Sequence, residues 1–296
     1  MSKIFGIDVS KWQGNFNFAK AKDEGVNFVI LRGAYSTGKD TKFEQYYSAC
    51  KALNLPVGVY HYSMAKTVTE ARTEANFLIN NVLKGKQFEY PIYMDVEDTV
   101  QLALGKDLLT EIVIAFCDTL EKAGYYAGIY STAYVLKTYT HETKLNRFDK
   151  WIAQWAKDCT YKGSYGMWQF GGETNLIRTN IVAGVKCDQD YCYKDYPTLI
   201  KKNKLNGYKE VKSVEVLAQE VLDGKWGAGQ ERKNRLTSAG YSYTDVQNKV
   251  NEMLKPKTYT VKQGDTLTAI AKANNTTVDK LVADNNLIKS GMVLKL

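Results

Sequence analysis

Short apolar segments alternate with helical stretches over residues 4–137, and this alternation most constrains the fold of the chain. Five apolar segments are short enough to be buried strands and cover residues 4–9, 28–33, 56–62, 92–96 and 125–130. The expected helices cover residues 18–24, 42–53, 69–83, 107–123 and 132–137. Strands that alternate with helices indicate a parallel sheet.

The alternation of strands and helices ends in the next part of the chain. Three strand-like segments follow one another there without full helices between them. They cover residues 151–155, 167–170 and 187–191. Eight strands in this order predict an α/β fold in which the sheet closes into an irregular TIM-like (β/α) barrel. In such barrels the chemistry sits at the carboxyl ends of the strands.

Acidic residues stand at these expected strand ends. Side chains alternate along a strand, so Asp95 and Glu97 share one face, while Asp98 is expected to point away and to matter little. Asp8 ends the first strand and falls at the same edge. Two acids at the end of a buried strand are costly unless they are paired, solvated or functional. Solvated loop carboxylates are the alternative interpretation.

The charge of the chain argues against two classes of partner. The net charge is +8, and the positive excess is divided evenly between residues 1–204 and 205–296, so no basic arm suggests a nucleic-acid partner. A mild positive field suits an anionic polymer such as a bacterial wall. No apolar run approaches the length of a membrane span, so membrane insertion is not expected. The sequence leaves the oligomeric state open.

The numbers of cysteine and histidine residues limit the classes of enzyme to which the chain can belong. Five cysteines without C-x-x-C spacing are expected to be reduced thiols, with a Cys187–Cys192 bridge as the alternative. The first residues enter a strand without a signal peptide, so we expect synthesis in a host cytoplasm and action on the wall after release. Two histidines, His61 and His141, are too few for a zinc amidase, and no metal or cofactor is expected. A Cys–His peptidase would need one of these unremarkable cysteines to pair with a histidine.

Several motifs in a fixed order carry a family resemblance. They are Gly6-Ile7-Asp8-Val9-Ser10-Lys11-Trp12-Gln13-Gly14, Leu31-Arg32-Gly33, Gly58-Val59-Tyr60-His61-Tyr62, Asp95-Val96-Glu97, Gly128-Ile129-Tyr130-Ser131, the Trp151/Trp155 and Trp168-Gln169 strands, and Cys187-Asp188-Gln189-Asp190. With these motifs, residues 1–200 resemble the glycoside hydrolase family 25 muramidases, the lysozymes common among phage endolysins. That family's fold is an irregular barrel of eight strands with fewer than eight helices.

The resemblance implies roles for four acids. Glu97 would be the general acid, and Asp95 would assist the 2-acetamido group of the substrate, which then acts as the nucleophile. Asp8 and Asp188 would be the two further acids of the site. The family pattern of valine, aspartate, any residue and asparagine favours Asp188 over Asp190.

Aromatic and basic residues of the same motifs are expected to bind the sugar. They are Trp12, Arg32, Tyr60, Tyr62, Tyr130 and Trp168. Aromatic rings suit sugar faces because they combine an apolar ring with a polar tip, but packing in the barrel core is the alternative for each. His61 is expected to be a satisfied polar residue rather than a catalytic one.

Two small modules are expected after a lysine-rich linker at residues 201–212. Residues 213–254 resemble a three-helix cell-wall-binding repeat, with Ala228 where an asparagine is usual. Residues 258–296 resemble a LysM domain of strand, helix, helix and strand, a module that binds glycans containing N-acetylglucosamine.

Together these features predict a lysozyme that cleaves the β-1,4 bond between N-acetylmuramic acid and N-acetylglucosamine. Its partners would be peptidoglycan chains, and its role that of a phage-type endolysin in bacterial lysis. A chitinase-type glycosidase is the first alternative, because such barrels also end a strand in D-x-E. A non-catalytic wall-binding protein is the second.

Overall fold

The computed structural model describes residues 3–172, 175–209, 212–255 and 258–287. The chain divides into two compact units, Met1–Glu210 and Val211–Leu296. Each unit is described by itself below.

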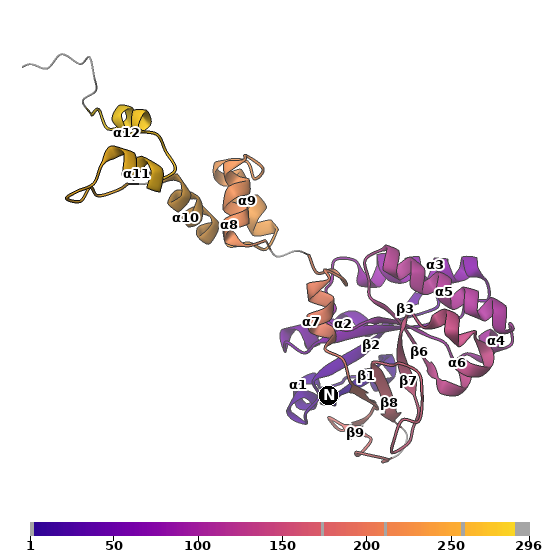
Figure 1. Cartoon of the computed structure of the whole chain (residues 1–296). Helices are drawn as coiled ribbons and strands as arrows, with labels where there is room; N and C mark the ends of the chain where they lie inside the picture. The colour runs from indigo at the N-terminus through magenta and orange to yellow at the C-terminus, as the bar shows by residue number, and fades with distance from the viewer. Residues whose placement is uncertain (1–2, 173–174, 210–211, 256–257, 288–296) are drawn as a thin grey trace, which may run out of the picture. The chain divides into compact units, whose positions relative to one another are not determined.

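Eight strands of the first unit close into a barrel (Figure 1). In chain order they are β1 (Ile4–Val9), β2 (Phe28–Tyr35), β4 (Val57–Tyr62), β5 (Ile92–Asp95), β6 (Ala127–Thr132), β7 (Asp149–Ala153), β8 (Met167–Gly171) and β11 (Asp188–Cys192). Their order around the barrel is β1-β11-β8-β7-β6-β5-β4-β2, and a parallel pairing between β1 and β2 closes it. This confirms the predicted irregular eight-stranded α/β barrel.

One strand runs against the others. β11 is antiparallel to both of its neighbours, β1 and β8, whereas the remaining pairs of the barrel are parallel. Its first residue, Asp188, therefore stands opposite Asp8, near the end of β1. The short strand β3 (Gly38–Lys39) extends β2, and β9 (Ile181–Val182) and β10 (Val185–Lys186) form a separate hairpin.

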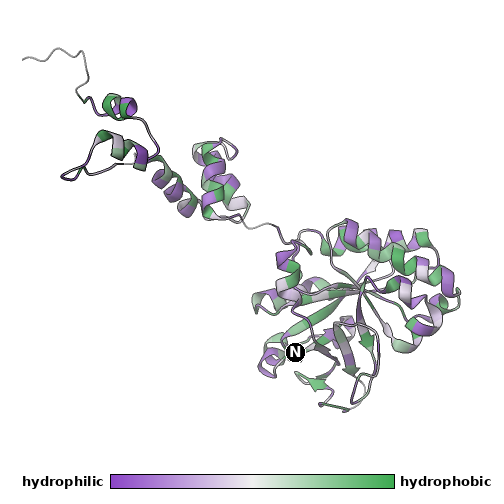
Figure 2. Cartoon of the chain, viewed as in Figure 1, coloured by the Kyte–Doolittle hydropathy of each residue, from purple (hydrophilic) through white to green (hydrophobic). Residues whose placement is uncertain are grey.

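Helices cover the outside of the barrel along the first six strands (Figure 1). They are α1 (Phe18–Asp23), α2 (Phe43–Ala52), α3 (Val68–Leu78), α4 (Thr99–Leu102), α5 (Lys106–Lys122) and α6 (Ala133–Tyr139), and a π-helical turn (Ile79–Leu83) continues α3. Polar side chains cap several of them; Thr67, for example, accepts from the backbone N–H of Glu70 at the start of α3. Figure 2 shows hydrophilic and hydrophobic residues mixed along α3 and α5, the pattern of helices with one buried face.

Alternate side chains of each strand fill two different regions. On β5, Ile92 and Met94 point outward into the main core beneath the helices, while Tyr93 points into the barrel and packs on Trp151 with ring centroids 5.2 Å apart. Glycine makes room for these inner rings: a Cβ atom at Gly6 would lie 2.4 Å from the ring of Phe28. Aromatic side chains therefore fill the barrel beneath its carboxyl-terminal edge.

The chain after the barrel is part of the first unit, which differs from the linker expected from residue 201. Helix α7 (Tyr196–Lys202) is followed by Asn206, which is fully buried. Its Oδ1 accepts from the backbone N–H of Tyr126 (2.7 Å), and its Nδ2 donates to the carbonyl of Tyr90 (2.8 Å). The lysines of residues 201–209 lie on the exposed surface of the first unit, and this explains why the sequence resembles a linker there.

The second unit begins with three helices, α8 (Val214–Leu222), α9 (Gly229–Ser238) and α10 (Tyr243–Leu254), around a small core. Ala228 occupies the N-cap position of α9 and makes no side-chain cap. Two further helices follow, α11 (Leu267–Ala273) and α12 (Val278–Asp284). Residues 258–262 are not in a strand, and the closing strand expected near the end falls on residues 288–296, outside the described residues.

Candidate active site

The carboxyl-terminal edge of the barrel surrounds one pocket of about 230 Å³. Its lining residues come mainly from the strand ends: Asp8, Val9, Ser10, Trp12, Gln13, Arg32, Tyr60, Tyr62, Asp95, Glu97, Tyr130, Trp151, Gln169 and Asp188. The structure thus brings the four predicted acids together with five of the six predicted sugar-binding residues. The pocket is a concave, acid-lined site of the kind that holds a polar ligand.

Backbone hydrogen bonds fix the positions of Asp95 and Glu97. β5 ends at Asp95, but Val96 continues the pairing because its N–H donates to the carbonyl of Tyr130 (3.0 Å) and its carbonyl accepts from Ser131 Oγ (2.6 Å). Glu97 follows this anchored residue. The Asp95 carboxyl is buried, and its Oδ1 has no hydrogen-bond partner among the described residues. Such an oxygen is a site for a donor on a ligand.

Burial and like charges raise the pKa of both acids. Burial raises the pKa of Asp95 well above its ordinary value, Glu97 adds to the rise, and Arg32 opposes it. The pKa of Glu97 is also raised, first by burial of its carboxyl group and then by Asp98. The Glu97 side chain remains partly open to solvent, so its rise is the smaller one. The charge of Glu97 thus disfavours ionisation of Asp95, the more deeply buried of the two acids.

Asp8 and Asp188 face each other across β1 and β11. Gln169 Nε2 donates to Asp8 Oδ2 (2.8 Å), and Gln169 Oε1 accepts from Tyr130 Oη (2.9 Å) and Trp155 Nε1 (3.0 Å). Burial raises the pKa of Asp8 well above its ordinary value, and Asp188 adds to the rise. On this side of the pocket, the side-chain amide of Gln169 therefore connects Asp8 to two aromatic side chains through hydrogen bonds.

Arg32 is the one basic side chain among the lining residues in the described part of the chain. Its Nε donates to Asp40 Oδ2 (2.8 Å), and Asp40 also accepts from the backbone N–H groups of Lys11 (3.1 Å) and Lys42 (2.9 Å). Asp40 is buried, and its carboxyl group joins β2, the 3₁₀ turn after β1 and the start of α2 beside the pocket. Acidic side chains therefore outnumber basic ones among the residues that line the pocket.

Trp168 is the predicted sugar-binding residue that does not reach the pocket. It is 1% exposed, its Nε1 donates to the carbonyl of Gln154 (2.7 Å), and its ring packs against Phe170 and Tyr191 in the main core. Strand alternation explains the difference, because on β8 Gln169 points inward and Trp168 points outward. The position of Trp168 corresponds to the alternative of packing in the core.

Aromatic side chains at the other predicted positions line the pocket. Trp12 is 76% exposed on a 3₁₀ turn (Lys11–Gln13) that follows β1. Tyr60, Tyr62 and Tyr130 project from β4 and β6, and Tyr62 Oη donates to Asp98 Oδ2 (3.1 Å). Asp98 thus contacts the pocket wall, contrary to the expectation that it would matter little.

Three polar groups of this region were missed by sequence reasoning. Gln169 and Asp40 belong to no acidic pair or aromatic motif, and Asp190 was set aside in favour of Asp188. Period-two alternation within the Trp168-Gln169 motif was the available signal for Gln169. His61, in contrast, points outward into the core, where its Nε2 lies 3.1 Å from Glu74 Oε2. Its Nδ1 is buried without a hydrogen-bond partner among the described residues, so only one of the two ring nitrogens is satisfied.

A groove of about 500 Å³ adjoins the pocket and shares Trp12, Arg32 and Tyr62 with it. Its other lining residues are Lys11, Tyr35, Gly38, Lys39, Asp40 and Thr41. Tyr35 stacks on Tyr62 with ring centroids 5.2 Å apart, and Lys11 Nζ lies 4.9 Å from the ring centroid of Trp12. The acidic pocket therefore continues into an aromatic and basic surface.

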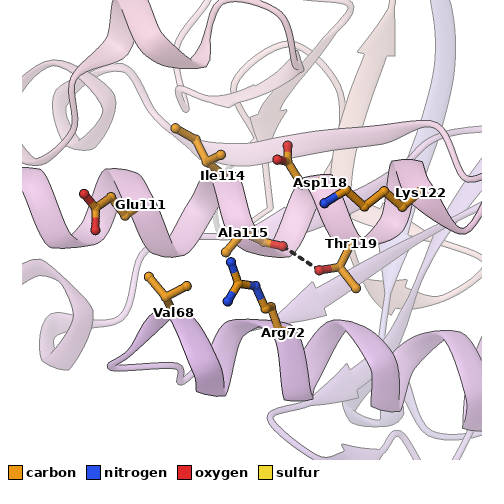
Figure 3. Close-up of a pocket in the computed structure, with 8 residues that line it drawn as sticks. All are labelled: Val68, Arg72, Glu111, Ile114, Ala115, Asp118, Thr119 and Lys122. Atoms are coloured by element: carbon orange, nitrogen blue, oxygen red, sulfur yellow. Dashed lines mark hydrogen bonds between the residues drawn. The ribbon is translucent and has the colours of Figure 1, made fainter.

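A separate depression of about 260 Å³ lies between α3 and α5 on the outside of the barrel (Figure 3). Its lining residues are Val68, Arg72, Glu111, Ile114, Ala115, Asp118, Thr119 and Lys122. Thr119 Oγ1 donates to the carbonyl of Ala115 within α5 (2.7 Å). No strand end contributes to this depression, so it is not part of the candidate site.

In residues 3–172, 175–209, 212–255 and 258–287, no cluster of three or more His, Cys, Asp or Glu residues is placed to hold a metal ion. None of the helices in these ranges has the length and apolar character needed to cross a bilayer. All five cysteines are free thiols, as predicted.

Comparison with known proteins gives three family matches along the chain. Glycosyl hydrolases family 25 matches residues 7–177, the CW_7 repeat matches residues 215–254, and the LysM domain matches residues 259–296. The lysozyme of Streptococcus phage Cp-7 is 27% identical over 263 residues, which cover 83% of this chain and 69% of that protein.

Solved structures share the fold. The bacterial lysozyme from Streptomyces coelicolor aligns with a TM-score of 0.58 at 20% identity, over 69% of this chain and 99% of that one. The autolysin LytC from Streptococcus pneumoniae, in complex with a synthetic peptidoglycan ligand, aligns with a TM-score of 0.56 at 24% identity. That match covers 64% of this chain and 47% of the autolysin, so the chain spans about half of its length.

Proposed function

Because the chain belongs to family 25 of the glycosyl hydrolases, we propose that it is a muramidase that cleaves the β-1,4 bond after N-acetylmuramic acid in peptidoglycan. The observation that carries this proposal is the pairing of a buried Asp95, whose Oδ1 has no partner among the described residues, with Glu97 at the open mouth of the same pocket. One carboxyl group is placed to orient the substrate, and the other can exchange protons with it.

In this mechanism Glu97 is the general acid. The bond between the anomeric carbon and the leaving oxygen breaks, and that oxygen takes the proton of Glu97. Because the pKa of Glu97 is raised, its carboxyl group keeps this proton to a higher pH than an ordinary glutamate does. A water molecule then attacks the anomeric carbon, and the bond that the 2-acetamido oxygen of the substrate has formed there breaks. The proton of this water returns to the Glu97 carboxylate.

Asp95 assists the 2-acetamido group of the substrate. Its Oδ1 accepts from the acetamido N–H, which directs the acetamido oxygen to form the new bond at the anomeric carbon. Burial favours the protonated form of Asp95 in the free enzyme. In the complex the donated N–H stabilises ionised Asp95, while Glu97 carries the proton that goes to the leaving oxygen. Asp8 and Asp188, on the opposite wall, are the further acids of the site.

The groove beside the pocket favours peptidoglycan over chitin. Lys11 makes no ion pair with any described residue and lies over the exposed ring of Trp12. Peptidoglycan carries anionic stem peptides on its muramic acid, whereas chitin is neutral, so a free ammonium group here suits the first polymer. Turnover of purified chitin without cleavage of walls would favour the chitinase alternative.

The modules after the barrel are proposed to tether the enzyme to the wall. We assign the barrel to residues 1–209, the three-helix repeat to residues 213–254 and the LysM domain to residues 258–296. Tethering raises the local substrate concentration without new catalytic contacts. The phage lysozyme and the autolysin named above make an endolysin role, on the wall after release, the best-supported one.

The test is Glu97→Gln, with mass spectrometry of digested wall. The wild-type chain should create new reducing ends on muramic acid, and the variant should lower kcat by about 10²- to 10⁴-fold without loss of fold or wall binding. New reducing ends on glucosamine would assign a different bond, and an unchanged rate would remove Glu97 from its role.

A further inference from the structure

Glu97 belongs to a short exposed segment between two buried residues. Val96, before it, is buried and bonded to β6 through both its N–H and its carbonyl. Glu97, Thr99 and Val100 are exposed, and the chain becomes buried again at Gln101, which is 0% exposed. The position of the Glu97 carboxyl group therefore depends on what fixes Gln101.

The side-chain amide of Gln101 uses both of its hydrogens on the chain that follows β4. Its Nε2 donates to Ser63 Oγ (3.1 Å) and to the carbonyl of Ala65 (3.0 Å). Ser63 and Ala65 are both buried and come shortly after Tyr62, the last residue of β4. The segment of Glu97 is thus bonded to β6 at one end and to the end of β4 at the other, and these two strands flank β5.

A buried acid holds the acceptor side of this anchor. Glu74 on α3 is 4% exposed and accepts from Ser63 Oγ (2.7 Å) and from the backbone N–H of Met64 (3.1 Å). Burial alone would raise the pKa of Glu74, but the hydrogen bonds from His61, Ser63 and Met64 bring it below its ordinary value. An ionised Glu74 only accepts, so Ser63 gives it the single hydroxyl hydrogen and accepts from Gln101.

One helical turn connects Gln101 to the pocket. Helix α4 has four residues, too few to be stable by itself. Its turn closes on Asp98, whose carbonyl accepts from the backbone N–H groups of Gln101 (2.9 Å) and Leu102 (3.1 Å). The side chain of Asp98 accepts from Tyr62 Oη at the pocket wall (3.1 Å). Two links therefore join this segment to the end of β4, one at the pocket and one in the buried interior.

We propose that Gln101 is a positioning residue that acts through its two hydrogen bonds to the chain after β4. It holds the Glu97 carboxyl group where this group can protonate the leaving oxygen. The role of Glu97 is taken from the proposed function, whereas the anchor itself rests on the hydrogen bonds of Gln101. Stability alone does not explain this amide, because its Oε1 is buried without a hydrogen-bond partner among the described residues, which costs stability.

The decisive variant is Gln101→Met in the full chain. Methionine has a similar length but donates no hydrogen bond, so the anchor is lost while the interior stays filled. A general acid acts in the transition state, so kcat and kcat/KM on a soluble glycan fragment should fall together by roughly 10- to 100-fold, with KM within about threefold of wild type. The Tm should change little, because removal of the unpaired oxygen partly offsets the two lost hydrogen bonds.

Thr110→Val is the matched control. Thr110 on α5 is 1% exposed, and its Oγ1 donates to the carbonyl of Lys106 (2.7 Å) and accepts from the backbone N–H of His141 (2.8 Å). Valine also removes two buried hydrogen bonds, and neither of them reaches the segment of Glu97. This variant should lower the Tm at least as much as Gln101→Met does, while kcat stays within about twofold of wild type. If Gln101 were only structural, the loss of activity would follow the loss of stability.

Hydrogen–deuterium exchange measures the anchor without any enzyme assay. The backbone N–H groups of Gln101, Leu102 and Ala103 are all bonded within the turn of α4. A peptide that contains these positions should exchange several-fold faster in Gln101→Met than in wild type, and at the wild-type rate in Thr110→Val. Ser63→Ala is the second variant: it removes one of the two acceptors of Gln101, so its kcat and its exchange should lie between those of wild type and Gln101→Met.

Either readout can overturn the proposal. A kcat of Gln101→Met as high as that of Thr110→Val, or an exchange rate equal to that of wild type, would refute the anchor. If Gln101→Met does not fold, a wild-type kcat in Ser63→Ala would refute it in the same way. If Glu97→Gln is fully active while the exchange still depends on Gln101, the anchor stands and the proposed role of Glu97 fails.

Discussion

Replacing Asp98 with asparagine tests whether the electrostatics of the site set the pH range of the enzyme. Asp98 is the second cause, after burial, of the raised pKa of Glu97. Its Oδ1 also caps α4 by accepting from the backbone N–H of Val100 (2.9 Å), and its Oδ2 accepts from Tyr62 Oη (3.1 Å). Asparagine is as good an N-cap as aspartate, so the substitution removes the charge and keeps the structure.

The size of the effect follows from the order of the two causes. Burial of Glu97 remains in Asp98→Asn, so only the smaller part of the rise is lost. Because Asp98 is partly solvated, its replacement should lower the pKa of Glu97 by only part of the rise that the folded structure causes. A general acid works while it is protonated, so the alkaline limb of kcat/KM should move to lower pH. Above that limb, kcat/KM should fall about three- to tenfold.

The assay is the pH profile of kcat/KM on a soluble glycan fragment, at low and high salt. Asp98→Ala is the control, because it removes the same charge and also the cap, which stabilises the fold by about 0.5–2 kcal/mol. Both variants should move the alkaline limb equally, but only the alanine variant should have a lower Tm. An alkaline limb that stays in place, or moves to higher pH, would refute the electrostatic reasoning.

Three further predictions concern stability and attachment. Asp40→Ala should lower the free energy of unfolding by about 3–5 kcal/mol, because it leaves Arg32 unpaired in a mostly buried position; an unchanged urea midpoint would contradict this. Ala228→Asn should raise the stability of the three-helix repeat by about 1 kcal/mol, since position 228 is an N-cap with extended backbone; an unchanged melting curve of the full chain in calorimetry would reject this cap assignment. Truncation after Lys209 should keep cleavage of soluble fragments and weaken wall binding in a pull-down assay, whereas equal wall affinity would reject the proposed tethers.

The barrel was predictable because its strands and helices are local patterns. Apolar segments such as residues 92–96 and 56–62 identified their strands. The end of the strand–helix alternation near residue 140 identified the half of the barrel that has few helices. The direction of β11 was not predictable in this way, because a five-residue strand reads the same in either direction. The pairing of β11 with β1 and β8 shows that the strand is antiparallel to both, which brings its first residue, Asp188, to the site.

The part of the site that could be predicted consists of acidic residues that lie close together in one short motif. Asp95 and Glu97 lie two residues apart, so strand alternation alone places them on one face. Asp40 and Gln169 act through partners that are distant in sequence, Arg32 and Asp8, and no local pattern marks such pairs. The choice of Trp168 over Gln169 shows that residue type outweighed strand alternation in that prediction.

Stability measurements can separate the functional carboxyl groups from the structural ones. The folded-state pKa of Glu97 is raised above its ordinary value of 4.5, so its contribution to stability is complete below that pH and is lost as the pH rises through the folded value. Glu97→Gln should therefore unfold at a higher temperature than wild type at neutral pH, and this advantage should vanish in acid. Asp149→Asn should instead unfold at a lower temperature than wild type at neutral pH, because it breaks an ion pair with Lys194. If Glu97→Gln were instead less stable at neutral pH, Glu97 would be a structural acid, since its charge would then stabilise the fold rather than oppose it.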